Sequence, residues 1–112
     1  MIPSQMLKGT LVGCIMAIIS KNETYGYEIS RQLEEYGFGI IAEGTIYPLL
    51  LRLEKNNMVS AVYRQSELGP KRKYYSLTDK GKTELEQFAK NYRELSAAVE
   101  RLFYDVEDGR NE

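Results

Sequence analysis

The 112-residue chain contains no histidine and a single cysteine, Cys14. Without histidine it can form neither a Ser-His-Asp triad nor a Cys-His dyad, and the common histidine-containing zinc sites are excluded as well. One cysteine can neither close an intramolecular disulfide nor supply a multi-cysteine metal site. Because no nucleophile–base pair, phosphate-binding loop or metal-ligand cluster stands out, we expect no catalytic residue, no metal ion and no cofactor, and we predict that the chain is not an enzyme.

Long apolar runs are also missing, since no segment approaches the roughly 18 apolar residues that a membrane-spanning helix requires. Residues 11–14 resemble a lipoprotein cleavage box, but apolar residues follow that segment instead of preceding it, so it does not fit an export signal. We therefore expect a cytoplasmic protein without a membrane partner. In this reducing compartment we interpret Cys14, which has apolar neighbours, as a core thiol, with a redox sensor as the alternative.

The net charge of −1 gives no indication of nucleic-acid binding by itself. The distribution of charge is more informative. Residues 1–80 carry ten lysines and arginines against eight acidic residues, and residues 81–112 carry five against eight, so the two parts have net charges of +2 and −3. The basic excess therefore lies in the first 80 residues.

Two helices are expected before residue 40. Apolar residues recur at helical spacing over Ser4–Ser20 and predict a largely buried helix, with Pro3 just before its start. A polar break follows at residues 21–23. Thr24 is then placed to cap a second helix that ends at Gly37.

The stretch Glu43–Asn57 is the most informative part of the chain. Its apolar residues form one buried stripe at helical spacing: Ile46, Leu49, Leu50 and Leu53. The other side is free to contact a partner and carries Thr45, Tyr47, Pro48, Leu51, Arg52 and Lys55. Because proline is tolerated in the first helical turn, Pro48 predicts a start near Gly44 or Thr45, whereas a start at Glu43 would remove one backbone hydrogen bond. Free N–H groups in that turn suit an approaching phosphate.

A β-hairpin is expected next, because Met58–Ser66 and Lys71–Thr78 are rich in β-branched residues and tyrosine and flank a turn around Gly69-Pro70. Its second arm opens with three basic residues, Lys71, Arg72 and Lys73, followed by two tyrosines. Basic residues at a hairpin tip can neutralise phosphates. The alternative is a solvated edge that lysines protect against aggregation.

From Thr78 onward the apolar residues alternate in steps of three and four, which is a heptad pattern and predicts a coiled-coil-like helix. At ~1.5 Å per residue, a helix over Thr78–Val106 would be about 42 Å long, which is long for one small core. We expect part of its apolar seam to close against a second subunit. Packing on the first helix of the same chain is the alternative, and the two are compatible. The predicted dimerisation residues are Leu85, Phe88, Tyr92, Leu95, Val99 and Leu102. The last residues, Glu107–Glu112, are polar and are expected to be frayed.

Three motifs follow one another along the chain: Tyr25-Gly26-Tyr27-Glu28-Ile29, Glu43–Pro48 with Arg52-Leu53-Glu54, and Gly69–Thr78. Taken together and in this order, they resemble the PadR family of bacterial winged-helix transcriptional regulators. The resemblance runs from about Leu7 to Phe103, and the single helix after the hairpin resembles the short subfamily. It implies a mainly α-helical fold with a small β-hairpin, divided into a winged helix-turn-helix DNA-binding domain at residues 1–78 and a dimerisation helix with a frayed tail at residues 79–112.

The resemblance also implies a function, that of a homodimeric, sequence-specific repressor on double-stranded DNA with a pseudo-palindromic operator. Carried onto matching positions, the DNA-binding residues would be Tyr25, Thr45, Tyr47, Pro48, Arg52, Lys71, Arg72 and Lys73. Two positions depart from many relatives. Leu51 replaces a basic or polar residue, so base preference cannot be transferred, and Lys71 adds a charge to the hairpin.

Some members of the family bind aromatic drugs or phenolic compounds between their subunits, and Tyr92 occupies the position of an aromatic residue that lines this cavity. By resemblance, a small aromatic effector would contact Val12, Met16, Phe88 and Tyr92. The alternative for Tyr92 is a packing role in the heptad seam. For the whole chain, the alternative to a DNA-binding regulator is a winged-helix module that binds a protein partner and not DNA, which the net negative charge keeps open.

Overall fold

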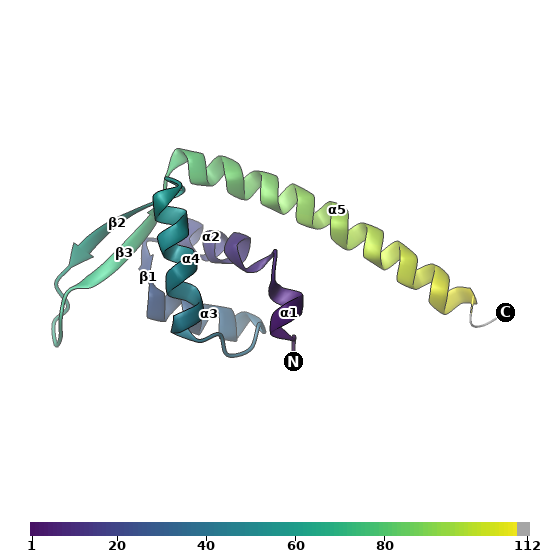
Figure 1. The fold of residues 1–112 in the computed structure, drawn as a ribbon, viewed down its shortest axis with the longest axis horizontal. Coiled ribbons are helices and arrows are strands. Elements are labelled where there is room, and N and C mark those ends of the chain that lie inside the picture. Colours follow the sequence, from purple (N-terminus) through teal and green to yellow (C-terminus); the bar gives the residue numbers. More distant parts are fainter. Residues whose placement is uncertain (110–112) are drawn as a thin grey trace.

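The computed structural model describes residues 1–109, which form a helical body, a protruding β-hairpin and one long C-terminal helix (Figure 1). The elements are α1 (Ser4–Leu7), α2 (Leu11–Lys21), β1 (Thr24–Tyr25), α3 (Gly26–Tyr36), α4 (Glu43–Lys55), β2 (Val59–Arg64), β3 (Arg72–Leu77) and α5 (Asp79–Gly109). A mainly α-helical fold with a small β-sheet and a long last helix is thereby confirmed.

The N-terminal helix is divided in two, so the prediction of one helix over Ser4–Ser20 is wrong. Gly9 has a φ of +90°, in the left-handed region that favours glycine, and this residue ends the helical path. The backbone N–H and the hydroxyl of Thr10 both donate to the carbonyl oxygen of Leu7, at 3.0 and 2.9 Å. These two hydrogen bonds give the last carbonyl group of α1 its partners, and the chain then turns into α2.

The start of α3 also differs from the prediction, because Thr24 does not cap it. Thr24 pairs with Tyr75 in the sheet, and its buried hydroxyl has no hydrogen-bond partner within residues 1–109. The predicted end at Gly37 is confirmed. Gly37 is left-handed, with a φ of +104°, and the N–H groups of Gly37 and Phe38 donate to the carbonyls of Glu34 and Leu33, each at 3.0 Å.

Helix α4 begins at Glu43, earlier than the start that Pro48 predicted. Pro48 is therefore the sixth residue of the helix and cannot donate to the carbonyl of Gly44. The N–H groups of Thr45 and Ile46 still close the first turn by donating to Ala42, at 2.9 and 3.3 Å. Tertiary packing sustains this longer helix, since Ile46, Leu50 and Leu53 are all buried in the core.

The predicted hairpin is confirmed and has a third strand beside it. The strand order is β1-β3-β2, with both pairs antiparallel, and β2 and β3 pair from Val59↔Leu77 to Arg64↔Arg72. In Figure 1 the β2–β3 hairpin, called the wing below, extends away from the helices. β1 was missed because two residues directly before a helix leave no alternating pattern to detect.

The core lies between α2, α3, α4 and the inner end of the sheet, where the side chains of Ile15, Ile29, Leu33, Ile46 and Leu50 are fully buried. Helix α5 joins this body through close contacts at two glycines. A Cβ atom on Gly13 would lie 2.4 Å from the ring of Phe88, and one on Gly81 would lie 2.0 Å from the carbonyl oxygen of Met58. These contacts hold the first part of α5 on α2 and on the base of the wing.

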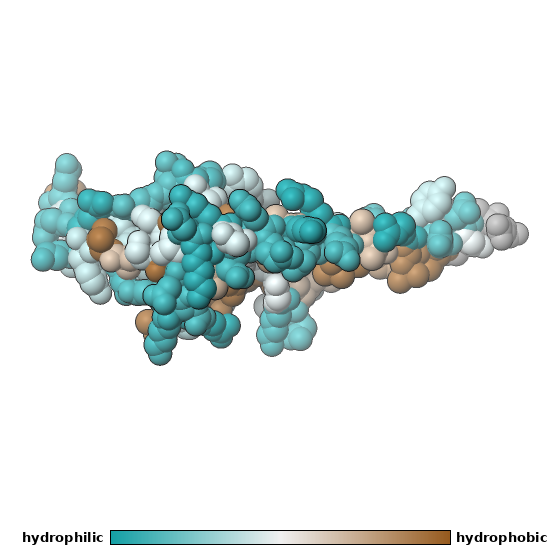
Figure 2. Space-filling model, turned by 90° about the horizontal axis from the view of Figure 1, so that it is seen from above, coloured by the Kyte–Doolittle hydropathy of each residue, from teal (hydrophilic) through white to brown (hydrophobic). Residues whose placement is uncertain are grey.

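The remainder of α5 leaves the body as an isolated helix, and the described part of the chain spans 63 Å along its longest axis (Figure 1). Figure 2 shows hydrophobic patches along one side of this projecting part. Residues Glu107–Gly109 are helical, which corrects the expected fraying for these three residues; the rest of the expected frayed tail lies outside the described residues. Within residues 1–109, no helix is both long and apolar enough to cross a membrane.

Candidate nucleic-acid interface

The exposed side of α4 forms one edge of the candidate interface. Gly44, Pro48, Leu51 and Lys55 follow one another at helical spacing along the middle of this side and are all exposed. Thr45 and Arg52 flank them on one side and Tyr47 flanks them on the other. The predicted contact residues of this helix therefore share one exposed surface, with Leu51 near its centre and 51% exposed.

Gly44 is unusual on this surface because nothing in the described chain requires a glycine there. A Cβ atom at Gly44 would meet no atom within 4 Å, and the residue does not have a positive φ. Glycine inside a helix costs roughly 1 kcal/mol relative to alanine. The absent side chain instead leaves the backbone of the first helical turn open to close approach from outside.

Tyr47 is held by the start of α3. A Cβ atom on Gly26 would lie 2.7–2.9 Å from the ring and the hydroxyl oxygen of Tyr47, so the glycine makes room for the phenol. Burial raises the pKa of the Tyr47 hydroxyl, and the nearby Glu43 carboxylate acts in the same direction. The hydroxyl is therefore protonated at neutral pH and can donate a hydrogen bond.

The outer face of the wing carries a stack of aromatic and cationic side chains. The guanidinium carbon of Arg72 lies 4.6 Å from the ring centre of Tyr25, and the Tyr25 and Tyr74 rings lie 5.2 Å apart. Tyr25 thus belongs to β1 and not to a helix, and it supports Arg72. A planar guanidinium held over an aromatic ring keeps its N–H groups available for phosphate oxygens.

Arg64 lies on the same face but is already neutralised. Its Nε and Nη2 atoms donate to the two carboxylate oxygens of Glu23, at 2.5 and 3.0 Å, and its guanidinium lies 5.9 Å from the Tyr74 ring centre. Hydrogen bonding to Arg64 lowers the pKa of Glu23, and the same bond raises the pKa of Arg64. This pair joins the residue directly before β1 to the last residue of β2.

Lys73 points to the opposite face of the wing, toward α4. Its Nζ donates to Oε1 of Glu54 at 2.7 Å and lies 5.7 Å from the Tyr75 ring centre and 5.9 Å from that of Tyr63. Hydrogen bonding to Glu54 raises the pKa of Lys73. Of the three consecutive cations, Lys71 and Arg72 are exposed near the tip, and Lys73 is paired with Glu54 of α4.

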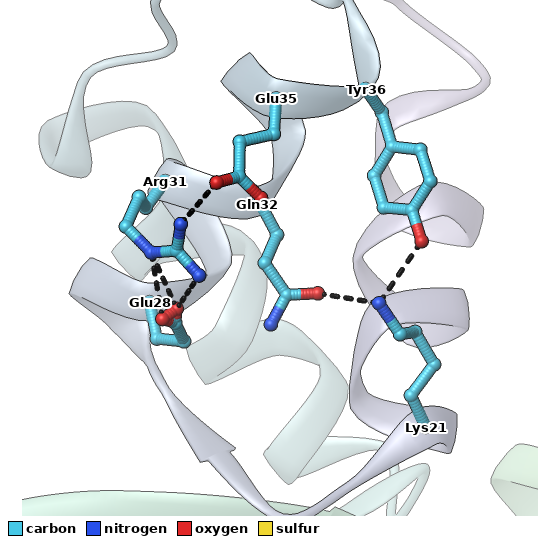
Figure 3. A network of polar contacts seen from close by, with 6 residues as sticks. All are labelled: Lys21, Glu28, Arg31, Gln32, Glu35 and Tyr36. Carbon is cyan, nitrogen blue, oxygen red and sulfur yellow. Dashed lines mark hydrogen bonds and ion pairs between the residues drawn. The ribbon is translucent and has the colours of Figure 1, made fainter.

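The outer side of α3 is a closed polar network (Figure 3). Arg31 is bound on one side by Glu28, at 2.8 Å, and on the other by Glu35. Lys21 of α2 donates to Gln32 Oε1 at 2.9 Å and to the Tyr36 hydroxyl at 3.0 Å. Because its one arginine is neutralised by two carboxylates, this side offers less positive charge than the tip of the wing.

The predicted dimerisation residues separate into two groups along α5. Leu85 is partly buried against the core, and Phe88 is partly buried with its ring against Gly13 of α2. Tyr92, Leu95, Val99 and Leu102 lie on the projecting part and are exposed. Packing of the seam on its own chain, the alternative to packing on a second subunit, therefore accounts only for Leu85 and Phe88.

The predicted ligand-binding residues are not brought together into one cavity within the described residues. Met16 is buried in the core, Val12 is partly buried, and the rings of Phe88 and Tyr92 stack with centres 6.3 Å apart and planes at 23°. A separate groove of about 910 Å³ includes Val12 but not the other three residues. It lies between α1, the segment before α4, and the Thr45, Leu49 and Arg52 side of α4.

Cys14 is half-buried beside the core, where burial raises the pKa of its thiol, in agreement with a packing role.

Two residues with a direct influence on this surface were missed by sequence reasoning. Glu54 was quoted only as part of a motif, although it lies seven residues after Tyr47 and so on the same side of α4, which faces the wing. Glu23 was assigned to a polar break, and its pairing with Arg64 is not apparent from the sequence because 41 positions separate the two residues.

Several known proteins resemble this chain in sequence and fold. Residues 15–87 match the sequence model of the transcriptional regulator PadR-like family. A PadR-like transcriptional regulator from Bacillus cereus is 51% identical, with a TM-score of 0.80 over 89% of this chain and 97% of that one. A Streptococcus transcriptional regulator is 44% identical, with a TM-score of 0.78 over 89% and 98%. An uncharacterised protein from Lysinibacillus sphaericus is 32% identical over 96% of this chain and its own full length.

These matches cover most of the chain and include the helical body and the wing, the parts that form the surface described above. The chain therefore belongs to the PadR-like family of transcriptional regulators, whose members are transcription factors and not enzymes.

Proposed function

We propose that this protein is a homodimeric, sequence-specific DNA-binding repressor that acts in the cytoplasm. Residues 1–78 form the DNA-binding unit in this proposal, and α5 forms the dimerisation unit. The observation that carries it is the pair of exposed surfaces on α4 and the wing: α4 has an exposed side with an open first turn, and the outer face of the wing carries an exposed, ring-supported Arg72. A helix of this size fits the major groove, and a flanking cation fits the phosphate backbone.

Helix α4 is the proposed recognition helix. Thr45, Tyr47 and Pro48 lie near its start, where they can reach base edges or the adjacent phosphates, and Gly44 lets the backbone come close. Leu51 supplies an apolar surface that suits a thymine methyl group, while Arg52 is placed for a phosphate. The hydroxyl of Tyr47 acts as a hydrogen-bond donor.

The wing is proposed to contact the neighbouring backbone. Arg72 is directed by the Tyr25 ring, and Lys71 is exposed one residue closer to the tip. Phosphate contacts of this kind fix register and orientation and carry little sequence information. Base selection would therefore come from α4, and the wing would supply affinity that depends on salt.

Dimerisation is proposed to occur through the exposed seam of α5. Apolar residues at heptad spacing on a projecting helix would remain in water in a single chain, and a second copy of the same helix buries them. A twofold dimer places two recognition helices on one duplex, so the operator would be pseudo-palindromic, with half-sites about one helical turn (~34 Å) apart or a multiple of it. A dimer bound there would block transcription of the adjacent gene.

Relief by a small aromatic compound is proposed at the stacked Phe88 and Tyr92 rings. Phe88 contacts the body at Gly13, and Tyr92 lies on the projecting helix. A planar ligand bound there between subunits would therefore contact the place where α5 joins the DNA-binding unit. Val12 and Met16 would contribute from α2. Binding is tested by tyrosine fluorescence and dimer melting across planar cationic and phenolic compounds, and unchanged signals across the panel would reject this part of the proposal.

The experiment for the main proposal is selection of bound duplexes from a random pool, followed by titration of the selected duplex at several salt concentrations. We expect a pseudo-palindromic consensus. If each subunit neutralises about four phosphates, the slope of log affinity against log salt is roughly −7 for the dimer, at ~0.9 per phosphate. A slope near zero, or equal affinity for every duplex, contradicts the proposal and favours the alternative, a winged-helix module that binds another protein.

A further inference from the structure

The two central cations of the wing, Arg72 and Lys73, face opposite sides of the sheet. Side chains alternate along a strand, so Arg72 shares a face with Tyr74, and Lys73 shares the other face with Tyr75. Arg72 lies over the Tyr25 ring and is exposed. Lys73 faces α4, and its side chain is 28% exposed. Adjacent residues of the same charge therefore have different surroundings.

The ammonium group of Lys73 already has a partner of opposite charge. Its Nζ lies 2.7 Å from Oε1 of Glu54, whose side chain is 34% exposed, and 5.9 and 5.7 Å from the ring centres of Tyr63 and Tyr75. A phosphate would have to displace the Glu54 carboxylate to reach this group. The carboxylate also cancels most of the field that Lys73 would project toward DNA.

The Lys73–Glu54 pair connects two elements that must meet DNA together. Glu54 is in the last turn of α4, and Lys73 is the second residue of β3, next to Arg72. Among the ion pairs of residues 1–109, this is the one that joins α4 to the wing. In Figure 1 the wing projects from the end of α4, so a small rotation at its base moves the tip and Arg72 by a larger distance.

We propose that Lys73 is a positioning residue, which acts through Glu54 to set the angle of the wing relative to α4, and that it makes no phosphate contact of its own. Arg72 makes the phosphate contact. This inference rests on the proposed DNA-binding function. It gives Glu54, an acidic residue beside a DNA-binding surface, a favourable role in binding, because its carboxylate holds the wing in register with the recognition helix.

Glu54→Gln is the decisive variant, because the two roles of Lys73 predict opposite results. If Lys73 is a positioning residue, Glu54→Gln frees the wing, and affinity for the selected operator falls about tenfold while affinity for a random duplex is unchanged or rises. If Lys73 binds phosphate, removing a nearby negative charge leaves operator affinity unchanged or tightens it. That second outcome overturns the proposal.

Lys73→Gln supplies an independent readout in the salt dependence of binding. A positioning residue changes affinity but leaves the log–log salt slope of the dimer unchanged. If Lys73 instead neutralised one phosphate in each subunit, the variant would reduce the magnitude of the slope by about 1.8, at ~0.9 per phosphate, and would overturn the proposal. Arg72→Gln is the matched control, for which that reduction is the expected result.

A double-mutant cycle completes the test. Once Glu54→Gln has broken the pair, adding Lys73→Gln should weaken operator binding less than twofold further, whereas a further tenfold loss would overturn the proposal. The thermal midpoint is measured for each variant, since a partly exposed ion pair contributes little to stability and all should fold like the parent. If the parent itself binds no operator specifically, the proposed function has failed; if the parent binds and Glu54→Gln binds equally well, only the positioning role has failed.

Discussion

The phenol ring of Tyr47, in α4, lies against the backbone of Gly26, the first residue of α3. A Cβ atom on Gly26 would come within 2.7 Å of the ring carbon Cε1 and 2.9 Å of the hydroxyl oxygen. The two helices of the helix-turn-helix are therefore in contact at a point where one has no side chain and the other has a large one. This contact fixes the direction of Tyr47, which is 47% exposed beside the proposed DNA contacts.

Gly26→Ala should displace the Tyr47 ring and weaken binding to the operator about tenfold. The added methyl group overpacks the contact, which typically costs about 1–3 kcal/mol in free energy of unfolding. Chemical denaturation and operator titration measure the two effects. In a Tyr47→Ala background the ring is absent, so Gly26→Ala should then have little effect on either quantity; an equal loss in both backgrounds would show that the glycine serves another purpose.

Gly44→Ala should change stability and binding in opposite directions. A methyl group at this exposed helical position meets no atom within 4 Å, so helix propensity alone should raise the free energy of unfolding by about 0.5–1 kcal/mol. The same methyl group occupies the space proposed for close approach of DNA, so operator affinity should fall about tenfold. A stabilised variant with unchanged affinity would remove Gly44 from the proposed interface.

How much of this structure can be predicted from the sequence depends on how far apart along the chain the interacting residues lie. The apolar stripe of α4, the left-handed end at Gly37 and the wing follow from local patterns, and the structure agrees with each. The break at Gly9 was missed because a glycine is tolerated within a helical pattern, and the early start of α4 was missed because tertiary packing outweighed the cost of Pro48.

The candidate site was less predictable than the fold for the same reason. Basic residues at the hairpin tip can be recognised along the chain, but their pairing cannot. Lys71, Arg72 and Lys73 read as one basic cluster, whereas strand alternation directs the last of them toward Glu54, 19 residues earlier. Arg64 similarly depends on Glu23. Contacts across a sheet or between a strand and a helix require the fold before they can be assigned.

Val99→Glu should dissociate the proposed dimer. Val99 is exposed on the projecting part of α5, within the apolar seam, where a second copy would desolvate the introduced carboxylate without a partner. Sedimentation should show a monomer at concentrations where the parent is dimeric, and operator affinity should fall at least a hundredfold. Ala97→Glu adds the same charge on the opposite side of the helix and should leave both properties unchanged. Equal behaviour of the two variants would contradict a seam-mediated dimer.

The Glu23–Arg64 pair should make a pH-dependent contribution to stability on the acid side. Arg64 lowers the pKa of Glu23 below its usual value of 4.5, so the contribution is fully present above that pH and is lost as pH falls through the lowered pKa. Stability of the parent relative to Glu23→Gln should be constant from pH 5 to 7 and should decrease toward zero below about pH 4. Arg64→Gln should abolish the same pH dependence, and a difference that grows on acidification would contradict the pairing.

Arg72→Ala should weaken binding to all duplexes by a similar factor and reduce the magnitude of the dimer's salt slope by about 1.8, at ~0.9 per phosphate. Its guanidinium is exposed and supported only by the Tyr25 ring, so no protein carboxylate competes with phosphate for it within the described residues. Lys90→Ala, at an exposed position of α5, removes the same single positive charge as a matched control and should alter the slope little. Because a backbone contact carries no base information, the selected consensus should stay the same for Arg72→Ala. A changed consensus would mean that the wing itself reads sequence, and identical slopes for the two variants would remove Arg72 from the interface.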